Sequence, residues 1–292
     1  MLGYVFAFLS SIFFSLYIIP RKLSKLSPVI FSLFMSFGFF GSTVVLYLFQ
    51  PIIQFHETAS PVLLWSIVAG IIWAAAFVLF VSSIDFIGLS RSNQWKNLQG
   101  PVGVMLSLFI LGETTTINPL YAILAALAIF LSALFFTTST NNKEKILVKG
   151  IFFATLAAFG FGTVAAIQKY VTAHVGVYTQ QVVWSASIAL SLLFYILICK
   201  KFKEIKISAK KEIYLGLVAG VIYLGASFFQ LFSYNYLAAS IGFTIIQMNA
   251  FWTITIGILI FKEIDIKKYY KNIIFGFIFT LVGILFLTFA KR

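Results

Sequence analysis

The sequence predicts an all-α integral membrane protein of ten transmembrane helices, arranged as two five-helix repeats of inverted topology. The chain is 61% hydrophobic and only 10% charged, whereas soluble domains are roughly half apolar and a quarter charged. It contains ten apolar runs, and about 20 apolar residues are enough to cross about 30 Å of hydrocarbon. The second half of the chain also repeats the first half. These three observations together define the fold class.

Little chain remains between the apolar runs, so no soluble catalytic domain has room to form. The first run has no basic residue before it and no small-residue cleavage site after it, so we expect it to be retained and not removed as a signal peptide. The ten expected membrane helices are Leu2–Ile19, Val29–Phe49, Val62–Ser82, Ile87–Leu111, Leu120–Thr137, Val148–Ile167, Tyr178–Cys199, Ile213–Phe232, Ala238–Phe261 and Ile273–Ala290.

The internal repeat is visible along the third and fourth helices. The segment Ser66–Trp73 returns as Gly216–Tyr223, at an offset of 150 residues (216 minus 66). The same offset relates the helix end Leu111–Glu113 to Phe261–Glu263. Two copies of an odd number of helices must lie upside down relative to each other, which is a common plan for secondary transporters.

A short polar linker, Thr137–Lys145, separates the two copies. We therefore divide the chain into a first five-helix repeat, residues 1–142, and a second, residues 143–292, which together form one membrane domain. Lipid gives helices no hydrophobic reason to associate, so close approach through small side chains must provide the packing. The motif Gly216-x-x-x-Gly220 predicts such a contact on the eighth helix.

The net charge of +13 reflects membrane orientation, and we expect no nucleic-acid partner. Basic residues gather at helix ends, and cytoplasmic loops carry the excess of Lys and Arg. Only Lys169, Lys291 and Arg292 fall on the opposite side. We therefore expect a multi-pass protein of the cell membrane with both termini outside the cytoplasm. The residues on the basic side are Arg21, Lys22, Lys25, Arg91, Lys143, Lys145, Lys149, Lys200, Lys201, Lys203, Lys206, Lys210, Lys211, Lys262, Lys267, Lys268 and Lys271.

The fourth helix is too polar for a span that faces lipid. Polar side chains at membrane depth are costly and usually face a cavity or the bundle interior. Gln94, Asn97 and Pro101 share one helical face, and the proline tends to bend the helix and open carbonyls to a cavity. The ninth helix offers Gln247 opposite Asn97 and Asn249 opposite Gln99 in the repeat alignment. Hydrogen bonding between helices is the structural alternative for these amides.

Amides both donate and accept hydrogen bonds, so they match hydroxyl groups without a net charge. We therefore expect Gln94, Asn97, Gln247 and Asn249 to bind a neutral, hydroxyl-rich solute. Aromatic rings make good walls for the apolar face of a sugar. Trp73 and Tyr223 occupy equivalent positions and, with Trp252, are candidates for this role. Ordinary core packing or interfacial anchoring is their alternative explanation.

Lys96 is the unusual charge in this region. It lies about 13 Å along a helix from Ile87, at 1.5 Å per residue, so it could reach back toward the cytoplasmic side. Otherwise it pairs with a substrate carboxylate or with a protein carboxylate such as Asp85. Glu113 and Glu263 occupy equivalent positions after the fourth and ninth helices, where we expect them to order the turns that follow.

Motifs for other functions are missing from the sequence. It has no phosphate-binding loop, no catalytic constellation and no metal-ligand spacing, and His56 and His174 stand alone. We therefore expect no enzyme activity, no cofactor, no metal and no catalytic residue. None of the ten runs contains an acidic residue, so the residues alone give no support for coupling to protons.

The layout resembles the drug/metabolite transporter superfamily, and within it the bacterial glucose/ribose porter family. The likeness lies in Ile84–Arg91, which leads to Leu111–Glu113, and in Ile241–Asn249, which leads to Phe261–Glu263. The second of these contains Gly242-Phe243-x-x-x-Gln247-Met248 and is the more specific. The resemblance implies sugar uptake, often linked to protons. The chain departs from the family at Trp95-Lys96-Asn97, which is bulkier and more charged.

We therefore expect a secondary transporter that moves a small polar solute, above all a sugar, by alternating access around a midplane site between the repeats. An exporter or exchanger of amino acids or organic anions, with Lys96 as the anion partner, is the alternative. A scaffold or receptor that transports nothing is a further alternative. An apolar interior would favour the scaffold, whereas a polar cavity between the repeats would favour transport.

The charge distribution predicts the orientation of the chain in the membrane. A reporter fused after Arg292 should be accessible from outside intact cells, because the basic loops stay in the cytoplasm. Accessibility to a membrane-impermeant reagent measures this. Labelling of the tag only after the cells are permeabilised would contradict the predicted topology.

Overall fold

The chain folds into a bundle of helices, as a computed structural model describes for residues 1–49, 60–136, 148–206, 209–260 and 266–290. No strand occurs in these ranges. The expected linker Thr137–Lys145 and the expected motif Phe261–Glu263 lie outside them. The helices are α1 (Leu2–Leu16), α2 (Ile19–Leu23), α3 (Pro28–Leu48), α4 (Leu63–Ile87), α5 (Leu89–Lys96), α6 (Gln99–Ile110), the 3₁₀ turn η2 (Glu113–Thr115), α7 (Pro119–Phe136), α8 (Val148–Thr172), α9 (Val177–Ile198), α10 (Phe202–Lys206), α11 (Lys210–Tyr236), α12 (Ala239–Ile246), α13 (Asn249–Leu259) and α14 (Ile266–Ala290).

Seven helical spans within these ranges are long and apolar enough to cross a membrane. They begin at Leu2, Pro28, Leu63, Val148, Val177, Lys210 and Tyr269. The protein is therefore an all-helical, multi-pass membrane protein. Three of the ten expected spans are not among the seven. The fourth and the ninth are each broken into two helices, and the apolar stretch of α7, Pro119–Ser132, is shorter. The count of ten spans stays a prediction.

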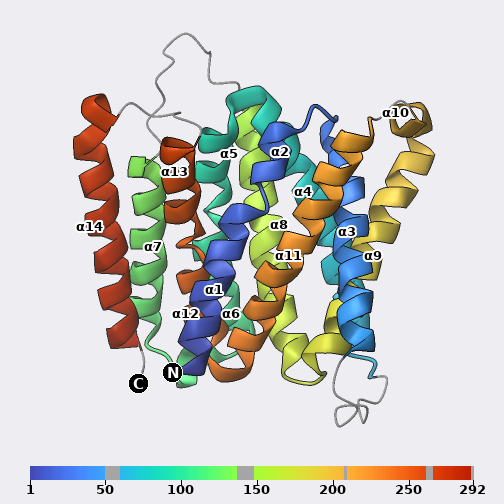
Figure 1. The fold of residues 1–292 in the computed structure, drawn as a ribbon. Coiled ribbons are helices and arrows are strands. Elements are labelled where there is room, and N and C mark those ends of the chain that lie inside the picture. Colours follow the sequence, from blue (N-terminus) through green and yellow to red (C-terminus); the bar gives the residue numbers. More distant parts are fainter. Residues whose placement is uncertain (50–59, 137–147, 207–208, 261–265, 291–292) are drawn as a thin grey trace.

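The helices stand side by side in one layer of membrane depth (Figure 1). We call the end where α1 begins and α14 stops the terminal end; there the Asn118 N–H donates to the Ala290 carbonyl (2.8 Å). The opposite end, which carries Arg21, Lys25 and Lys201, is the basic end. Both chain termini thus lie on the same side of the bundle.

Apolar side chains cover both the inside and the outside of the bundle. Large apolar residues of α14, such as Phe275, Leu281 and Phe289, are exposed, as expected for a face that contacts lipid. The interior instead holds a cluster of buried aromatic rings that includes Phe77 and Trp184. Because helices satisfy their own backbone hydrogen bonds, they can cross hydrocarbon in this way.

Glycines allow α11 to pack against α3 with almost no space between the backbones. A Cβ atom added at Gly220 would lie 2.1 Å from the Met35 carbonyl oxygen and 2.4 Å from the Phe39 nitrogen. A Cβ atom at Gly38 would lie 2.1 Å from the Leu217 oxygen. The predicted close contact of the Gly216-x-x-x-Gly220 helix is confirmed, and its partner is α3.

This contact predicts a clear difference between two glycine substitutions. Gly220→Ala should destabilise the protein by about 1–3 kcal/mol, because overpacking forces backbones apart. Gly41→Ala, on α3, should leave stability unchanged, since nothing lies within 4 Å of an added Cβ there. The unfolding temperatures of both variants in detergent, followed by tryptophan fluorescence, measure the difference. Equal unfolding temperatures for the two variants would contradict the packing argument.

Candidate functional site

Two broken helices meet near the middle of the bundle. The first break separates α5 from α6 at Asn97–Leu98, and the second separates α12 from α13 at Gln247–Met248. The two breaks are 150 residues apart (247 minus 97), which is the offset of the sequence repeat. The expected bend near Pro101 is therefore present, four residues earlier than the proline.

The proline explains the first break. A regular helix would require the residue at position 101 to donate a hydrogen bond to the Asn97 carbonyl, but proline has no N–H and its ring clashes with that carbonyl. The Asn97 carbonyl instead accepts a hydrogen bond from the Gly100 N–H (3.0 Å). The Gln247 carbonyl accepts one from the Ala250 N–H in the same way (3.2 Å), although no proline follows in that half.

The two breaks touch each other across the bundle. The Gln99 amide nitrogen donates to the Gln247 amide oxygen (2.9 Å). A Cβ atom added at Gly100 would lie 2.9 Å from the Gln247 Cγ atom. The absence of a side chain at this glycine thus lets the second break approach the first.

A small cavity of about 40 Å³ lies beside these breaks. Its polar lining residues are Lys96, Gln99, Gln168, Gln230 and Asn249. Ligand pockets are roughly 300 Å³ or larger, so the cavity is smaller than a binding pocket for a whole sugar in this conformation. A polar cavity of this kind favours a transporter over a scaffold with a purely apolar interior.

Aromatic rings form the rest of the cavity wall. Trp73 and Tyr223, which the repeat singled out, lie with their ring centroids 5.1 Å apart, and both line the cavity. Tyr17 adds an edge-on contact to Tyr223 (5.2 Å). Trp184 completes this wall. The sequence comparison of α4 with α11 therefore found two residues that the fold brings together.

The four amides proposed from the sequence do not lie equally near the cavity. Asn249 lines it, and its amide nitrogen donates to the Ile246 carbonyl (2.9 Å). Asn97 and Gln247 are buried at the breaks behind the cavity wall. Gln94 is only half-buried and is not among the residues that line the cavity.

Trp252 lies away from the cavity wall. Its indole N–H donates to the Ser11 hydroxyl of α1 (3.1 Å), and its ring contacts Phe8 and Phe251. The ring therefore packs α13 against α1. The described contacts of Trp252 fit a role in core packing better than a role in the wall of a solute site.

Sequence reasoning missed a second group of amides, on α8 and α11. The Gln230 amide nitrogen donates to the Gln168 amide oxygen (3.2 Å) and to the Tyr234 hydroxyl (2.8 Å). The Gln180 amide nitrogen donates to the Gln168 carbonyl (3.0 Å). The signal was available, because Gln168 and Gln230 are amide residues within apolar helices, and such residues usually face a cavity or the bundle interior.

Several buried polar atoms near the cavity have no hydrogen-bond partner within the described part of the chain. Trp184 Nε1 and Gln168 Nε2 are unsatisfied donors in the cavity wall, and Asn249 Oδ1 is an unsatisfied acceptor. Gln247 Nε2 and both amide atoms of Asn97 are also unsatisfied. Buried polar groups are costly when unpaired, so these atoms are available to a ligand or to water.

Lys96 extends into the bundle interior and not toward the basic end. Its side chain is 4% exposed, it lines the cavity, and its ammonium nitrogen lies 5.1 Å from the ring centroid of Phe80. Asp85, the partner suggested from the sequence, pairs instead with Arg21 (2.8 Å). Asp85 therefore does not pair with Lys96, because the Arg21 guanidinium of α2 lies directly beside Asp85 at the end of α4.

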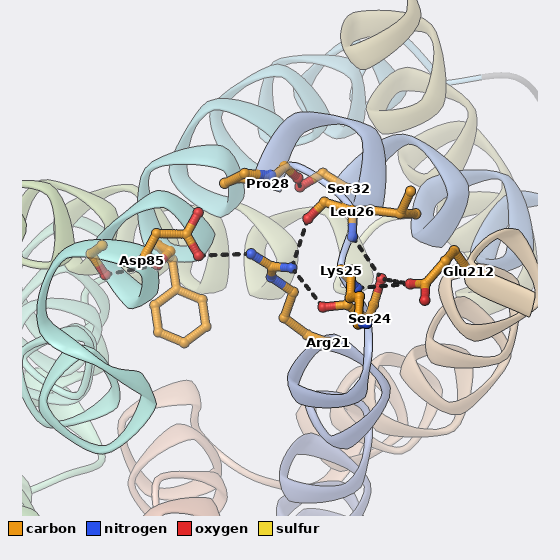
Figure 2. Close-up of polar contacts among 10 residues, drawn as sticks. Arg21, Ser24, Lys25, Leu26, Pro28, Ser32, Asp85 and Glu212 are labelled. Atoms are coloured by element: carbon orange, nitrogen blue, oxygen red, sulfur yellow. Dashed lines mark hydrogen bonds and ion pairs between the residues drawn. The ribbon is translucent and has the colours of Figure 1, made fainter. Parts of the chain in front are cut away.

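Polar contacts link helices at the basic end of the bundle (Figure 2). The Arg21 guanidinium donates to Asp85 and to the Leu26 carbonyl (2.9 Å). The Glu212 carboxylate accepts hydrogen bonds from the Ser24 hydroxyl (2.7 Å) and the Lys25 N–H (2.8 Å). These bonds connect α2 to α4, and the segment after α2 to α11.

A different set of contacts links helices at the terminal end. The Glu113 carboxylate accepts hydrogen bonds from the N–H groups of Ala239 (2.6 Å) and Ser240 (3.0 Å), at the start of α12. The Lys169 ammonium donates to the carbonyls of Leu237 (2.9 Å) and Tyr234. Glu113 was expected to order its own turn. It caps the distant helix α12 because the first N–H groups of a helix lack partners and attract an anion.

Comparison with known proteins gives three findings. The model of a family described as sugar transport protein matches residues 33–290. An uncharacterized protein of Haemophilus influenzae is 23% identical over 211 residues, which cover 71% of this chain and 70% of that protein. A protein of known crystal structure superposes with a TM-score of 0.74 at 12% identity, covering 98% of this chain and 97% of the other. At that identity, the structural likeness concerns the fold alone.

Proposed function

Because the chain belongs to the sugar transport protein family, we propose that it is a secondary transporter that carries a sugar or a similar small polar solute across the cell membrane. The observation that carries this proposal is the cavity beside the two broken helices, whose wall combines amide side chains with aromatic rings. Unsatisfied amide atoms and a wall of aromatic rings meet there. Hydroxyl groups would satisfy the amides, and the apolar face of a sugar ring would stack on Trp73 and Tyr223.

We further propose that the ten spans form two inverted repeats, residues 1–142 and 143–292. Matching contacts support this arrangement. Gly3 of α1 lies against Tyr236 and Leu237, at the end of α11. Its counterpart Gly150 of α8 lies against Phe86 and Ile87, at the end of α4. The contact pairs α4–α8 and α1–α11 correspond in the same way, as do α5–α8 and α12–α1.

In this proposal, transport proceeds by alternating access to the cavity. The Arg21–Asp85 and Glu212 contacts hold the basic end closed, and the Glu113 and Lys169 contacts hold the terminal end closed. The two sets involve different helices, so either one can open while the other remains. The closed conformation corresponds to an occluded state between the two openings.

Counterflow in proteoliposomes tests the function. Purified protein should exchange a radiolabelled sugar from a panel of hexoses and pentoses against the same unlabelled sugar, with and without a pH gradient. Stimulation by the gradient would identify the coupling ion. A folded protein that exchanges none of the sugars or their acidic derivatives, but exchanges amino acids, would replace the sugar proposal with the alternative.

The amide groups generate a prediction with a matched control. Gln230→Ala and Asn249→Ala, which truncate two amides of the cavity wall, should each weaken sugar binding about two- to tenfold, which corresponds to one neutral hydrogen bond of about 0.5–1.5 kcal/mol. Asn235→Ala, which removes an exposed amide on the same helix as Gln230, should bind as the parent does. Equilibrium binding in detergent measures all three. Equal affinities for all variants would exclude the amides from the site.

The contacts at the two ends predict side-specific access to the cavity. Cys199 is the one cysteine of the chain, so Cys199→Ser provides a background in which Val164→Cys places a thiol in the cavity wall. Glu113→Ala should speed labelling of this thiol from the terminal side, whereas Asp85→Ala should speed it from the basic side. A membrane-impermeant maleimide, applied to oriented vesicles, measures the rates.

The control for this experiment is the Val164→Cys protein with both ends intact, which should react slowly from either side. If Glu113→Ala increased labelling equally from both sides, the contact would stabilise the whole bundle and would not close one end.

A further inference from the structure

The charges around the cavity are unbalanced. Among the described residues that line it, Lys96 is the only one with a charged side chain, and no aspartate or glutamate accompanies it. No described carboxylate forms an ion pair with Lys96. The face of the Phe80 ring, 5.1 Å from the ammonium, is attractive to a cation, but it carries no net charge.

The carboxylates that the structure describes are all engaged at the two ends of the bundle. Asp85 pairs with Arg21, and Glu212 accepts hydrogen bonds from Ser24 and Lys25. Glu113 caps α12, and Glu204 accepts a hydrogen bond from the Ser27 hydroxyl (2.6 Å). None of the four is therefore available to balance the ammonium in the cavity.

The free donors in the cavity wall point to the same kind of ligand. Trp184 Nε1 and Gln168 Nε2 are buried donors with no described partner in the wall. Together with the ammonium of Lys96, they offer hydrogen bonds to a ligand that carries acceptors. A neutral sugar brings one donor with every hydroxyl, whereas a carboxylate brings only acceptors.

We propose that the natural solute is an acidic sugar whose carboxylate binds Lys96. This inference rests on the proposed transport function and specifies its substrate class. The hydroxyl groups of the solute remain for the amides Gln168, Gln230 and Asn249, and its ring remains for Trp73 and Tyr223. A single ammonium matches a singly charged carboxylate better than a doubly charged phosphate, because the wall offers no second cation among the described residues.

The experiment compares three probes that share one ring: glucuronate, glucose and glucose 6-phosphate. Each competes for counterflow of a labelled sugar in proteoliposomes at fixed pH. The parent protein should prefer glucuronate to glucose by about tenfold or more. Lys96→Gln should lose about ten- to a hundredfold in glucuronate affinity, the range for a hydrogen bond to a charged group, and should keep glucose within severalfold. Lys96→Arg should retain most of the preference.

Lys149→Gln is the matched control. Lys149 also lies over aromatic rings, 5.2 Å from Phe86 and 5.5 Å from Phe153, but it is exposed and outside the cavity wall. Loss of the Lys149 charge should change the affinity for neither glucuronate nor glucose. The preference of the parent protein decides the question even if Lys96→Gln fails to fold, which size-exclusion chromatography would reveal.

The outcomes separate the two proposals. Glucose bound as well as glucuronate by the parent would overturn the acidic substrate and leave the sugar transporter intact. Preference for glucose 6-phosphate over both other sugars would also overturn the carboxylate in favour of a phosphate. Failure of the folded parent to bind any of the three, or any other sugar, would overturn the transport proposal itself.

Discussion

The need to satisfy backbone hydrogen bonds away from water governs this fold. Hydrocarbon offers no partner to a free N–H or carbonyl, so irregular backbone at membrane depth must be sheltered by protein. The interruptions at Asn97–Leu98 and Gln247–Met248 meet this condition, because α8 packs against α5 and α6 while α1 packs against α12 and α13. The sheltered breaks bring polar atoms to the centre without exposing them to lipid, and the cavity lies beside them.

Charge is distributed between the ends and the centre in a consistent way. The described carboxylates hold segments together at the two ends, through backbone N–H groups, hydroxyls and the Arg21 guanidinium. The ammonium of Lys96 is left in the centre. Contacts at the ends are accessible to water when they open, so breaking them is cheap compared with moving an uncompensated charge through lipid. This division suits a protein whose contacts at the two ends can break and whose centre binds a solute, as we propose.

Much of the fold could be predicted because long apolar stretches in the sequence identify membrane helices directly. The expected helix Tyr178–Cys199 agrees with α9 (Val177–Ile198) to within one residue at each end, and the polarity of the fourth helix marked the first break. The second break could not be predicted in this way, because no proline marks it. The sequence repeat also identified the pair Trp73 and Tyr223, whose rings both line the cavity.

Other parts of the site were hidden because the two copies differ there. Gln230 corresponds to Phe80 in the repeat (230 minus 150), and Lys96 corresponds to Ile246. Polar residues without a polar counterpart do not appear in a repeat comparison, so Gln230 was missed. The capping of α12 by the Glu113 side chain was missed for another reason. Its helix partner, α12, is more than 100 residues away in the chain, and sequence spacing gives no measure of that distance.

The two breaks look alike, but they differ in whether they can be repaired. Pro101 lacks an amide hydrogen, so no movement of α5 and α6 can restore a regular hydrogen bond to the Asn97 carbonyl. Phe251 stands at the equivalent position of the second half, and its N–H now donates to the Met248 carbonyl (3.0 Å). Phe251 keeps the N–H that a regular helix would need at this position, so the covalent structure leaves α12 and α13 free to join. The first break is thus fixed by the chemistry of one residue, whereas the second depends only on packing.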